Sequence, residues 1–276
     1  MKQKKRKGAG RSELRVKFSH DLIWGMHPVL EALRSEPERI AELILQKDKR
    51  GSGWQEIIDC ARLAHIKCSF AERITITDSL EGNITHQGVI ARVAPVKFLP
   101  FDELLAQFAA RVQNREMVKI IACDCIQDPH NLGAIIRSAH ASGVEHVLLT
   151  RERSAPLGGT AAKAAAGALS RVKISQVTNL VEALLALKEA GAWVFGAVKD
   201  PEGESIYQTD LCLPLCLVVG NEARGIRPLV KRSCDVLISI PMAGDIDSLN
   251  SSVAGAVIMF EMHRQALAHE ENLKLS

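Results

Sequence analysis

Residues 118–150 have the sequence VKIIACDCIQDPHNLGAIIRSAHASGVEHVLLT. Continuous apolar runs of strand length lie at both ends, over residues 118–123 and 146–150, and a helical segment lies between them at residues 132–142. A strand, a helix and a second strand in this order form the unit from which parallel sheets are built. We therefore predict that this stretch begins a mostly parallel α/β domain.

The same alternation continues toward the C-terminus. Further apolar runs of strand length lie at residues 193–198, 215–220 and 236–240, with helical segments at residues 160–169, 180–190, 228–234 and 248–267. Strands that are apolar at nearly every position are typical of a parallel sheet covered by helices on both faces. The alanine- and glycine-rich stretch 161–168 indicates close helix packing.

A smaller α/β segment precedes this domain. It contains a short helix opened by Pro28, a strand over residues 43–46, helical spacing over residues 57–64 and an apolar run over residues 88–93. Pro95 and Pro100 then interrupt the pattern, and residues 101–112 are expected to form a connecting helix. The expected organisation is a disordered basic tail over residues 1–19, a small domain over 20–95, a linker over 96–114 and the larger domain over 115–270.

The positive charge of the chain is concentrated at its start. The net charge is +3, and residues 1–17, with eight lysines or arginines and one acid, contribute +7, which leaves −4 for the rest. A short basic segment of this kind is typical of a disordered arm that lies on a polyanion such as a nucleic acid. The alternative is a solubilising tail with no partner.

The composition excludes several classes of protein. Hydrophobic residues make up 47% and charged residues 24%, as in soluble globular proteins. The seven cysteines show no CxxC motif and no paired cysteine and histidine spacing, so we expect reduced thiols and no metal site. Since no apolar stretch approaches the roughly 18 residues of a membrane span, we predict a soluble, cytoplasmic protein.

Three polar clusters directly follow expected strands of the larger domain. They are DPHNLGAIIRS at residues 128–138, VVGNEARGI at residues 218–226 and IPMAGDIDSLNSS at residues 240–252. In open α/β sheets, ligands bind where loops leave the carboxyl ends of the strands. We therefore expect the three loops to converge on one pocket.

Common nucleotide and acyl-transfer motifs are not found in these clusters. Gly220 and Gly225 have the glycine spacing of a P-loop, but the required lysine and hydroxyl residue are replaced by Ile226 and Arg227. No GxGxxG sequence follows a strand and opens a helix, and there is no GxSxG elbow. Ser248 is therefore expected to form hydrogen bonds or to cap the last helix rather than to act as a nucleophile.

In order and spacing, the three clusters resemble the three motifs of the SpoU family of RNA 2'-O-ribose methyltransferases. Further segments are similar to the branch of this family that methylates a guanosine in 23S ribosomal RNA: GMHPVLEAL (25–33), HQGVIARV (86–93), RSAPL (153–157) and VTNL (177–180). The resemblance covers nearly everything after the basic tail. Ser251 departs from it, because the family usually has valine there, and so does Ser170, where the ribosomal branch commonly has an acid.

The resemblance implies a particular architecture and a particular cofactor. The small domain would be an RNA-binding domain similar to ribosomal protein L30, and the larger one a SPOUT fold whose C-terminal segment forms a trefoil knot. The protein would work as a homodimer, use S-adenosyl-L-methionine and bind RNA, most simply large-subunit ribosomal RNA. It implies neither a metal nor a DNA or membrane partner.

The resemblance also assigns roles to individual residues. Gly220, Ile240 and Leu249 match positions that contact the cofactor. The family's polar catalytic positions correspond to Asn131, Arg137, Glu222, Ser248 and Asn250. Arg137 would either accept the proton of the ribose hydroxyl or, as we prefer for a permanently charged guanidinium, bind a phosphate and stabilise negative charge on the oxygen. Asn131 would cap its helix or contact the substrate, and His130 is expected to be structural.

Two alternatives remain open at the level of the sequence. The first is the same chemistry on a transfer RNA, against which the small N-terminal domain argues. The second is a non-catalytic RNA-binding factor in ribosome assembly, against which the complete set of polar motif residues argues.

Overall fold

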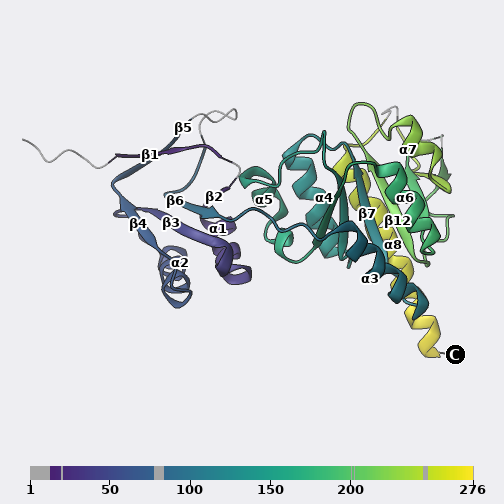
Figure 1. Ribbon diagram of the computed structural model, residues 1–276, viewed down its shortest axis with the longest axis horizontal. Helices are drawn as coiled ribbons and strands as arrows, with labels where there is room; N and C mark the ends of the chain where they lie inside the picture. Colours follow the sequence, from purple (N-terminus) through teal and green to yellow (C-terminus); the bar gives the residue numbers. More distant parts are fainter. Residues whose placement is uncertain are drawn as a thin grey trace, which may run out of the picture. The chain divides into compact units, whose positions relative to one another are not determined.

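The computed structural model describes residues 13–19, 21–77, 84–199, 201, 203–244 and 248–275 (Figure 1). The chain divides into two compact units, Met1–Pro95 and Val96–Ser276. None of the helices within the described residues combines the length and the hydropathy that a membrane crossing requires.

The first unit is built on a four-stranded sheet with two helices on one face. The strand order is β2 (Leu22–Trp24), β6 (Val89–Val93), β3 (Ile40–Gln46), β4 (Cys68–Ala71), with β6 antiparallel to both neighbours and β4 parallel to β3. Alternate residues of β3 face opposite sides. Leu43 and Leu45 pack in the cluster that includes helices α1 (Met26–Ser35) and α2 (Ser52–Leu63), whereas Ile44 packs in the cluster on the other face.

The other face of this sheet packs against a second, two-stranded sheet, which corrects the predicted extent of the basic tail. Strands β1 (Glu13–Lys17) and β5 (Arg73–Thr77) pair in parallel, and both contribute buried residues, Val16 and Ile74. Residues 13–17 are therefore a strand and not part of a disordered tail. Three charged residues surround Val16, so the segment looks like a tail in sequence. The part of the predicted tail over residues 1–12 lies outside the described residues.

The segment predicted to be a linker is also structured. Residues 101–113 form helix α3, in which Leu104 and Phe108 are fully buried in the core of the second unit. The backbone amide of Leu99 also donates to the carbonyl of Ile174, 2.8 Å away. The helix expected over residues 101–112 is confirmed. The prediction that residues 96–114 form a linker was wrong for most of its length, because α3 is a covering helix of the larger fold.

The second unit is built on a seven-stranded sheet in which every pairing is parallel, as predicted. The strand order is β11 (Glu204–Ser205), β13 (Val236–Ser239), β10 (Trp193–Ala197), β12 (Leu215–Gly220), β7 (Lys119–Asp124), β8 (His146–Thr150), β9 (Lys173–Val177). The five strands expected from apolar runs all form within one or two residues of their predicted limits. The short β11 and the polar β9 were not predicted.

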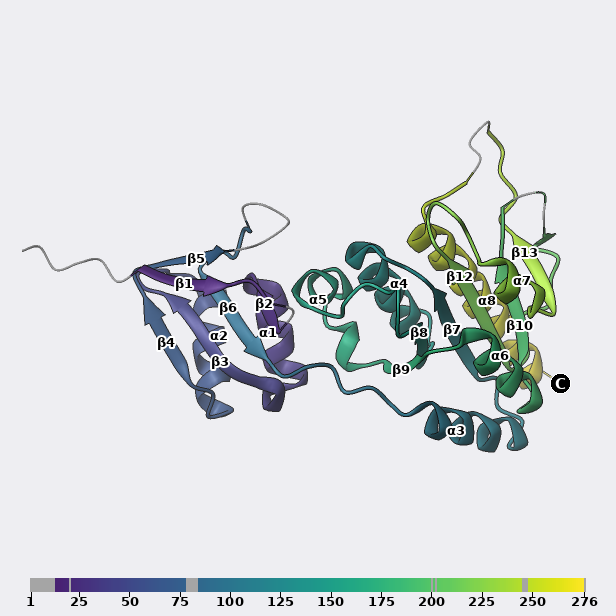
Figure 2. The same ribbon diagram turned by 45° about the horizontal axis from the view of Figure 1, so that its top comes forward.

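Helices cover both faces of this sheet (Figure 2). One face is covered by α4 (Pro129–Ala141), α5 (Gly159–Ala165) and α8 (Ser251–Leu275), and the other by α3, α6 (Leu180–Glu189) and α7 (Pro228–Arg232). Consecutive strand residues pack on opposite faces of the sheet. Ile121 packs with α4 and α8, and Ile120 packs with α3 and α6. Burial on both sides explains why the strands are apolar at nearly every position.

Helices α4 and α5 approach each other closely. A Cβ atom added at Gly133 would lie 2.4 Å from the carbonyl oxygen of Ala161 and 2.6 Å from Cβ of Ala164. The small residues at positions 161–168 thus allow close helix packing, as predicted.

Candidate functional site

The three polar clusters lie at the same edge of the seven-stranded sheet. Strands β7, β12 and β13 are parallel, and the clusters follow their carboxyl ends. The first cluster begins helix α4, the second forms the loop of residues 221–227, and the third leads into helix α8. Residues 245–247 of the third cluster lie outside the described residues.

Side-chain hydrogen bonds join all three clusters at Asn131. Its amide Nδ2 donates to Oε1 of Glu222 at 2.7 Å, and its Oδ1 accepts from Nδ2 of Asn250 at 3.0 Å. Asn131 is only 8% exposed. Three of the five predicted catalytic residues are therefore connected by hydrogen bonds through Asn131, although they lie up to 119 positions apart in sequence.

Two serines that had no predicted role extend this network. Oγ of Ser251 donates to Oε1 of Glu222 at 3.1 Å, and Oγ of Ser252 lies 2.6 Å from Oδ1 of Asn250 and 3.2 Å from Oδ1 of Asn131. Ser251 is the residue that replaces the usual valine of the family, so the substitution adds a hydrogen bond to the site. In the sequence, Ser251 could be noticed only as a departure from the usual valine. The structure shows that its hydroxyl is hydrogen-bonded to Glu222.

The two helices that begin at the site are capped by other residues than expected. Asn250 and not Ser248 caps α8, and Asp128 and not Asn131 caps α4. Helix α8 begins at Ser251, and Oδ1 of Asn250 accepts from the backbone amide of Ser252 at 2.9 Å. Helix α4 is capped by Asp128, which accepts from the amide of His130 at 2.8 Å. The cap position leaves Asn131 one turn inside α4, where its amide reaches the other clusters.

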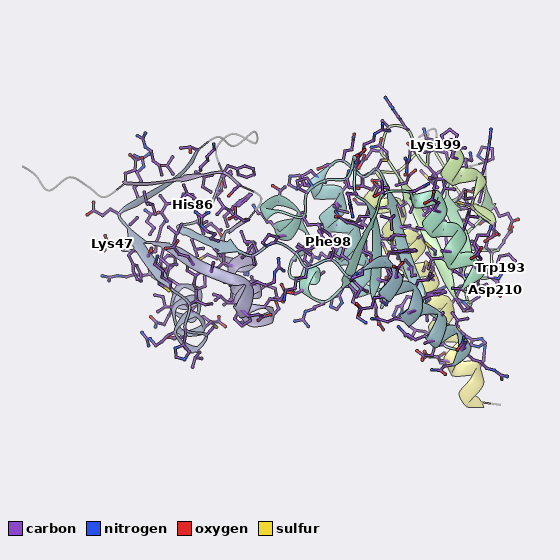
Figure 3. The ribbon with its side chains drawn as sticks, viewed as in Figure 1. Lys47, His86, Phe98, Trp193, Lys199 and Asp210 are labelled. Carbon is purple, nitrogen blue, oxygen red and sulfur yellow. The ribbon has the colours of Figure 1, made fainter. Side chains whose placement is uncertain are left out.

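A pocket of about 310 Å³ lies beside the network. All three predicted cofactor-contacting residues, Gly220, Ile240 and Leu249, line it, together with Glu222 and Ser248. The volume lies at the lower end of the range of roughly 300–1,000 Å³ found for small-molecule sites. Its apolar lining also includes Val219, Ala254 and Ile258, and its cations include Lys199, labelled in Figure 3, and Arg224.

Gly220 is required for a different reason from the one expected. The resemblance implied that this position contacts the cofactor. In the structure, a Cβ atom at this position would lie 2.2 Å from the carbonyl carbon of Gly225 and 2.3 Å from the amide nitrogen of Ile226. The loop after β12 turns back on its own strand end, and only glycine leaves room for it.

Within this loop, Asn221 and Gly225 exchange two backbone hydrogen bonds, with N–O distances of 3.0 and 2.8 Å. The side chain of Asn221 accepts from the amide of Ala223 and donates to the carbonyl of Cys125 and to Glu222. These contacts fix the backbone on both sides of Glu222. The carboxylate is thereby held toward Asn131.

An ion pair with a buried carboxylate fixes the far end of the loop and was missed in the sequence. Asp124, the last residue of β7, is 0% exposed, and it accepts from Nε of Arg227 at 2.7 Å and from the backbone amide of the same residue at 2.8 Å. Arg227 had been considered only as a mismatch to the P-loop pattern. The position of Asp124, an acid at the end of an otherwise apolar strand, was the sequence feature that could have indicated this contact.

Arg137 is not part of this network. It is exposed on α4, does not line the pocket, and within the described part of the chain has no hydrogen bond or ion pair. It lies six residues, or about 9 Å along the helix axis, from Asn131. Ser248 lines the pocket but likewise has no hydrogen bond to a described residue, and His130 is exposed.

The most deeply buried cysteines are unsuited to nucleophilic or metal-binding chemistry. All seven are free thiols, and burial raises the pKa of Cys123 to about 12 and also raises that of Cys216. Protonated buried thiols are poor nucleophiles and poor metal ligands. Among the described residues, no three histidine, cysteine or acidic side chains are grouped to hold a metal ion.

Comparison with known proteins identifies both units. Residues 119–260 match the model of the SpoU rRNA methylase family, and residues 22–99 match a model described as RNA 2'-O ribose methyltransferase substrate binding. The chain is 38% identical over 254 residues to the 23S rRNA (guanosine-2'-O-)-methyltransferase RlmB of Vibrio parahaemolyticus, covering 91% of this chain and 99% of that protein. It is 35% identical to the putative TrmH family tRNA/rRNA methyltransferase YacO of Bacillus subtilis, covering 89% and 96%.

Solved structures share the fold. The SpoU methyltransferase AviRb of Streptomyces viridochromogenes in complex with AdoMet superposes with a TM-score of 0.66 at 22% identity, covering 89% of this chain and 90% of that one. An AdoMet-bound rRNA methyltransferase of Sinorhizobium meliloti gives a TM-score of 0.65 at 23% identity, covering 88% and 86%.

Proposed function

The chain belongs to the SpoU rRNA methylase family, and from this premise we propose that it methylates the ribose 2'-hydroxyl of a guanosine in 23S ribosomal RNA. The methyl donor is S-adenosyl-L-methionine. The observation that carries the proposal is the hydrogen-bonded convergence of Asn131, Glu222 and Asn250 beside a pocket of suitable size. These residues come from the three clusters that match the family motifs.

The lining of the pocket suits this cofactor. Val219, Ile240 and Ile258 supply apolar surface for the adenosine part. Glu222 offers a carboxylate and Lys199 an ammonium group to the charged methionine part. When bound, S-adenosylmethionine supplies a methyl group on a positively charged sulfur.

The polar network would position the ribose. The reaction forms a bond between the ribose O2' and the methyl carbon, breaks the sulfur–methyl bond, and releases the hydroxyl proton. Such a displacement depends on alignment of the reacting atoms. Because Glu222 accepts from both Asn131 and Ser251, its carboxylate is held in one orientation, with Asn250 fixed alongside.

We assign Arg137 to the RNA rather than to the cofactor. Arginine remains protonated at neutral pH, so it is unsuited to accept the proton. As an exposed, unpaired cation among the described residues, Arg137 can bind the phosphate next to the target ribose and stabilise developing charge on O2'. Arg151, Arg153 and Lys163 are further exposed cations of this unit that can contact phosphates.

The finer architecture is also proposed on the basis of the family. Residues 20–95 would be the RNA-binding domain similar to ribosomal protein L30, and the segment after β13 would form a trefoil knot. The hydrogen bonds from the loop of residues 221–227 to the starts of α4 and α8 hold together the segments that such a knot would involve. A cytoplasmic location fits an enzyme that acts on ribosomal RNA.

We further propose that the protein acts as a homodimer. Val253, Phe260 and Leu267 are exposed on α8 at intervals of seven residues, which places them on one side of the helix. An apolar row of this kind fits an interface with a second copy better than contact with water.

Methyl transfer from labelled cofactor to an unmodified 23S rRNA transcript, followed by mapping of 2'-O-methyl positions, tests the activity. A single methylated guanosine supports the proposal, and Glu222→Gln should lose the activity whereas the exposed Glu189→Gln on α6 should keep it. Methylation of tRNA instead would favour the alternative allowed by the name of the Bacillus relative. No heat of binding with S-adenosylmethionine in calorimetry would favour a non-catalytic RNA-binding factor.

A further inference from the structure

The exposed cations of the first unit differ in whether an acid neutralises them. Six cations of this unit, two of them only partly exposed, are paired within the described residues: Arg15–Glu13, Arg34–Glu56, Arg39–Glu36, Arg62–Asp59, Lys67–Glu42 and Arg92–Asp21. Five exposed cations have no such partner among the described residues: Lys17, Lys47, Lys49, Arg50 and Arg73. Lys47, Lys49 and Arg50 are the three of these that lie together in one loop. Three of the four residues in the loop of residues 47–50 are thus unneutralised cations, and Asp48 is its only acid.

This loop is held in place by backbone contacts with its neighbours. The amide of Lys47 donates to the carbonyl of Ala71 at 2.7 Å, and the amide of Gln46 donates to the carbonyl of Gly88 at 2.8 Å. The loop therefore lies beside the turn of residues 86–88. In Figure 3, His86 lies inside the unit and Lys47 at its rim.

The turn of residues 86–88 is itself fixed. Nδ1 of His86 accepts from the amide of Gly88 at 3.0 Å, and Nε2 lies 3.2 Å from the carbonyl of Ile74. Both contacts are satisfied by a neutral ring that carries its proton on Nε2, in accord with the lowering of the His86 pKa by burial. A Cβ atom at Gly88 would lie 3.2 Å from Cγ and Cε of Lys49, so the glycine lets the lysine stem lie across the turn.

Two helices begin at the same edge with no negative charge in their first turns. Helix α2 follows Arg50 almost directly, and helix α1 begins beside Gln87, whose Oε1 accepts from the amide of Met26 at 2.8 Å. Neither first turn contains an acid. The partial positive charge of the helix starts therefore adds to the charge of the loop.

We propose that the loop of residues 47–50, with the adjoining turn of residues 86–88, binds the phosphodiester backbone of the RNA substrate. The inference rests on the proposed function and specifies which surface of the first unit contacts the RNA. A cation that has no ion pair within the protein can bind a phosphate without first breaking such a pair. Contacts of this kind fix register and orientation and carry no sequence information.

The test compares two triple variants of the full chain with equal change in charge. The first replaces Lys47, Lys49 and Arg50 by alanine. The matched control replaces Arg34, Arg62 and Lys67, three cations of the same unit whose ion pairs are exposed and contribute little to stability. Affinity for a 23S rRNA transcript is measured over a series of salt concentrations, with thermal unfolding and S-adenosylmethionine binding as checks of folding.

Each lost phosphate contact lowers the slope of log affinity against log salt by about 0.7–0.9. The first variant should therefore lose about 2–3 units of slope and bind more weakly at low salt, while the control keeps the wild-type slope. The inference is overturned if the first variant binds like the wild type, or if the control loses as much. Methyl transfer by the wild type is scored separately, so a protein that binds RNA through this loop but transfers no methyl group contradicts only the proposed function.

Discussion

Asp124→Asn tests whether the loop that carries Glu222 depends on the buried carboxylate at the end of β7. In the wild type this carboxylate accepts two hydrogen bonds from Arg227, one from its backbone amide and one from its charged guanidinium. An asparagine of nearly the same size can still accept the backbone amide, but its own NH₂ group or a neutral oxygen then faces Nε of Arg227. The substitution thus removes the charge-assisted bond and keeps the packing.

The magnitude follows from the exposure of the two partners. A hydrogen bond between charged groups contributes roughly 1.5–3 kcal/mol. The Arg227 side chain is 42% exposed and can recover water, whereas Asp124 is fully buried. We therefore expect a loss of about 2 kcal/mol, which lowers the melting temperature of a unit of this size by roughly 4–8 °C. Since residues 221–226 line the pocket, the affinity for S-adenosylmethionine should fall by about tenfold or more.

A matched control exists at the opposite edge of the same sheet. Asp235 accepts from the backbone amide of Val194 at 2.8 Å and pairs with Lys188 at 2.6 Å, so its contacts resemble those of Asp124. It precedes β13, away from the carboxyl ends of the strands. Asp235→Asn should lower the melting temperature without changing cofactor affinity in calorimetry. Wild-type cofactor affinity in Asp124→Asn, or an equal loss in both variants, would refute the reasoning.

Three other substitutions address single features of the fold and the site. Gly220→Ala places a Cβ atom against the backbone of Gly225 and Ile226, so we expect a loss of about 1–3 kcal/mol and little cofactor binding; unchanged calorimetry would contradict it. Arg137→Ala should abolish methyl transfer, while the melting temperature and the cofactor affinity stay within error because the side chain is exposed and outside the pocket. His146 is 1% exposed, and burial lowers its pKa to about 4 from 6.5. Below pH 6.5 the unfolded state binds a proton that the folded state does not, so the free energy of unfolding should fall by roughly 1.4 kcal/mol per pH unit down to about pH 4. His146→Leu should remove this slope in urea titrations at several pH values, and an equal slope in the variant would contradict the assignment.

The strands that could be predicted are those whose two faces are both apolar. Strands β8 and β12 formed within the predicted limits because burial on both sides demands an uninterrupted apolar run. Strand β9 has the sequence KISQV and was missed, although Ser175 in it is completely buried. Its Oγ has no hydrogen-bond partner among the described residues. Buried strand positions are generally apolar, and Ser175 is an exception. A rule based on hydropathy therefore does not predict strand β9.

The site also has features that could be predicted from the sequence and features that could not. The convergence of the three clusters follows from strand order and direction, and the sequence was sufficient to expect it. Which atoms meet depends on the start of each helix to within one residue. With α8 beginning at Ser251 rather than Ser248, Asn250 becomes the cap and Ser251 turns toward Glu222. A shift of one residue rotates a helical side chain by about 100°, so local pattern alone cannot assign these contacts.

This dependence on helix starts makes Ser251 the sharpest test of the network. Ser251→Val restores the residue usual in the family and removes the hydroxyl that donates to Glu222 Oε1, while Asn131 continues to donate to the same oxygen at 2.7 Å. The lost bond should cost roughly 0.5–1.5 kcal/mol, and methyl transfer should fall by less than about tenfold. Asn131→Leu removes the contacts to both Glu222 and Asn250 and should nearly abolish transfer, because among the described residues Asn131 carries the hydrogen bonds of the first cluster to the other two. Equal rates of transfer for the two variants in single-turnover assays would show that the clusters are held together by the backbone alone.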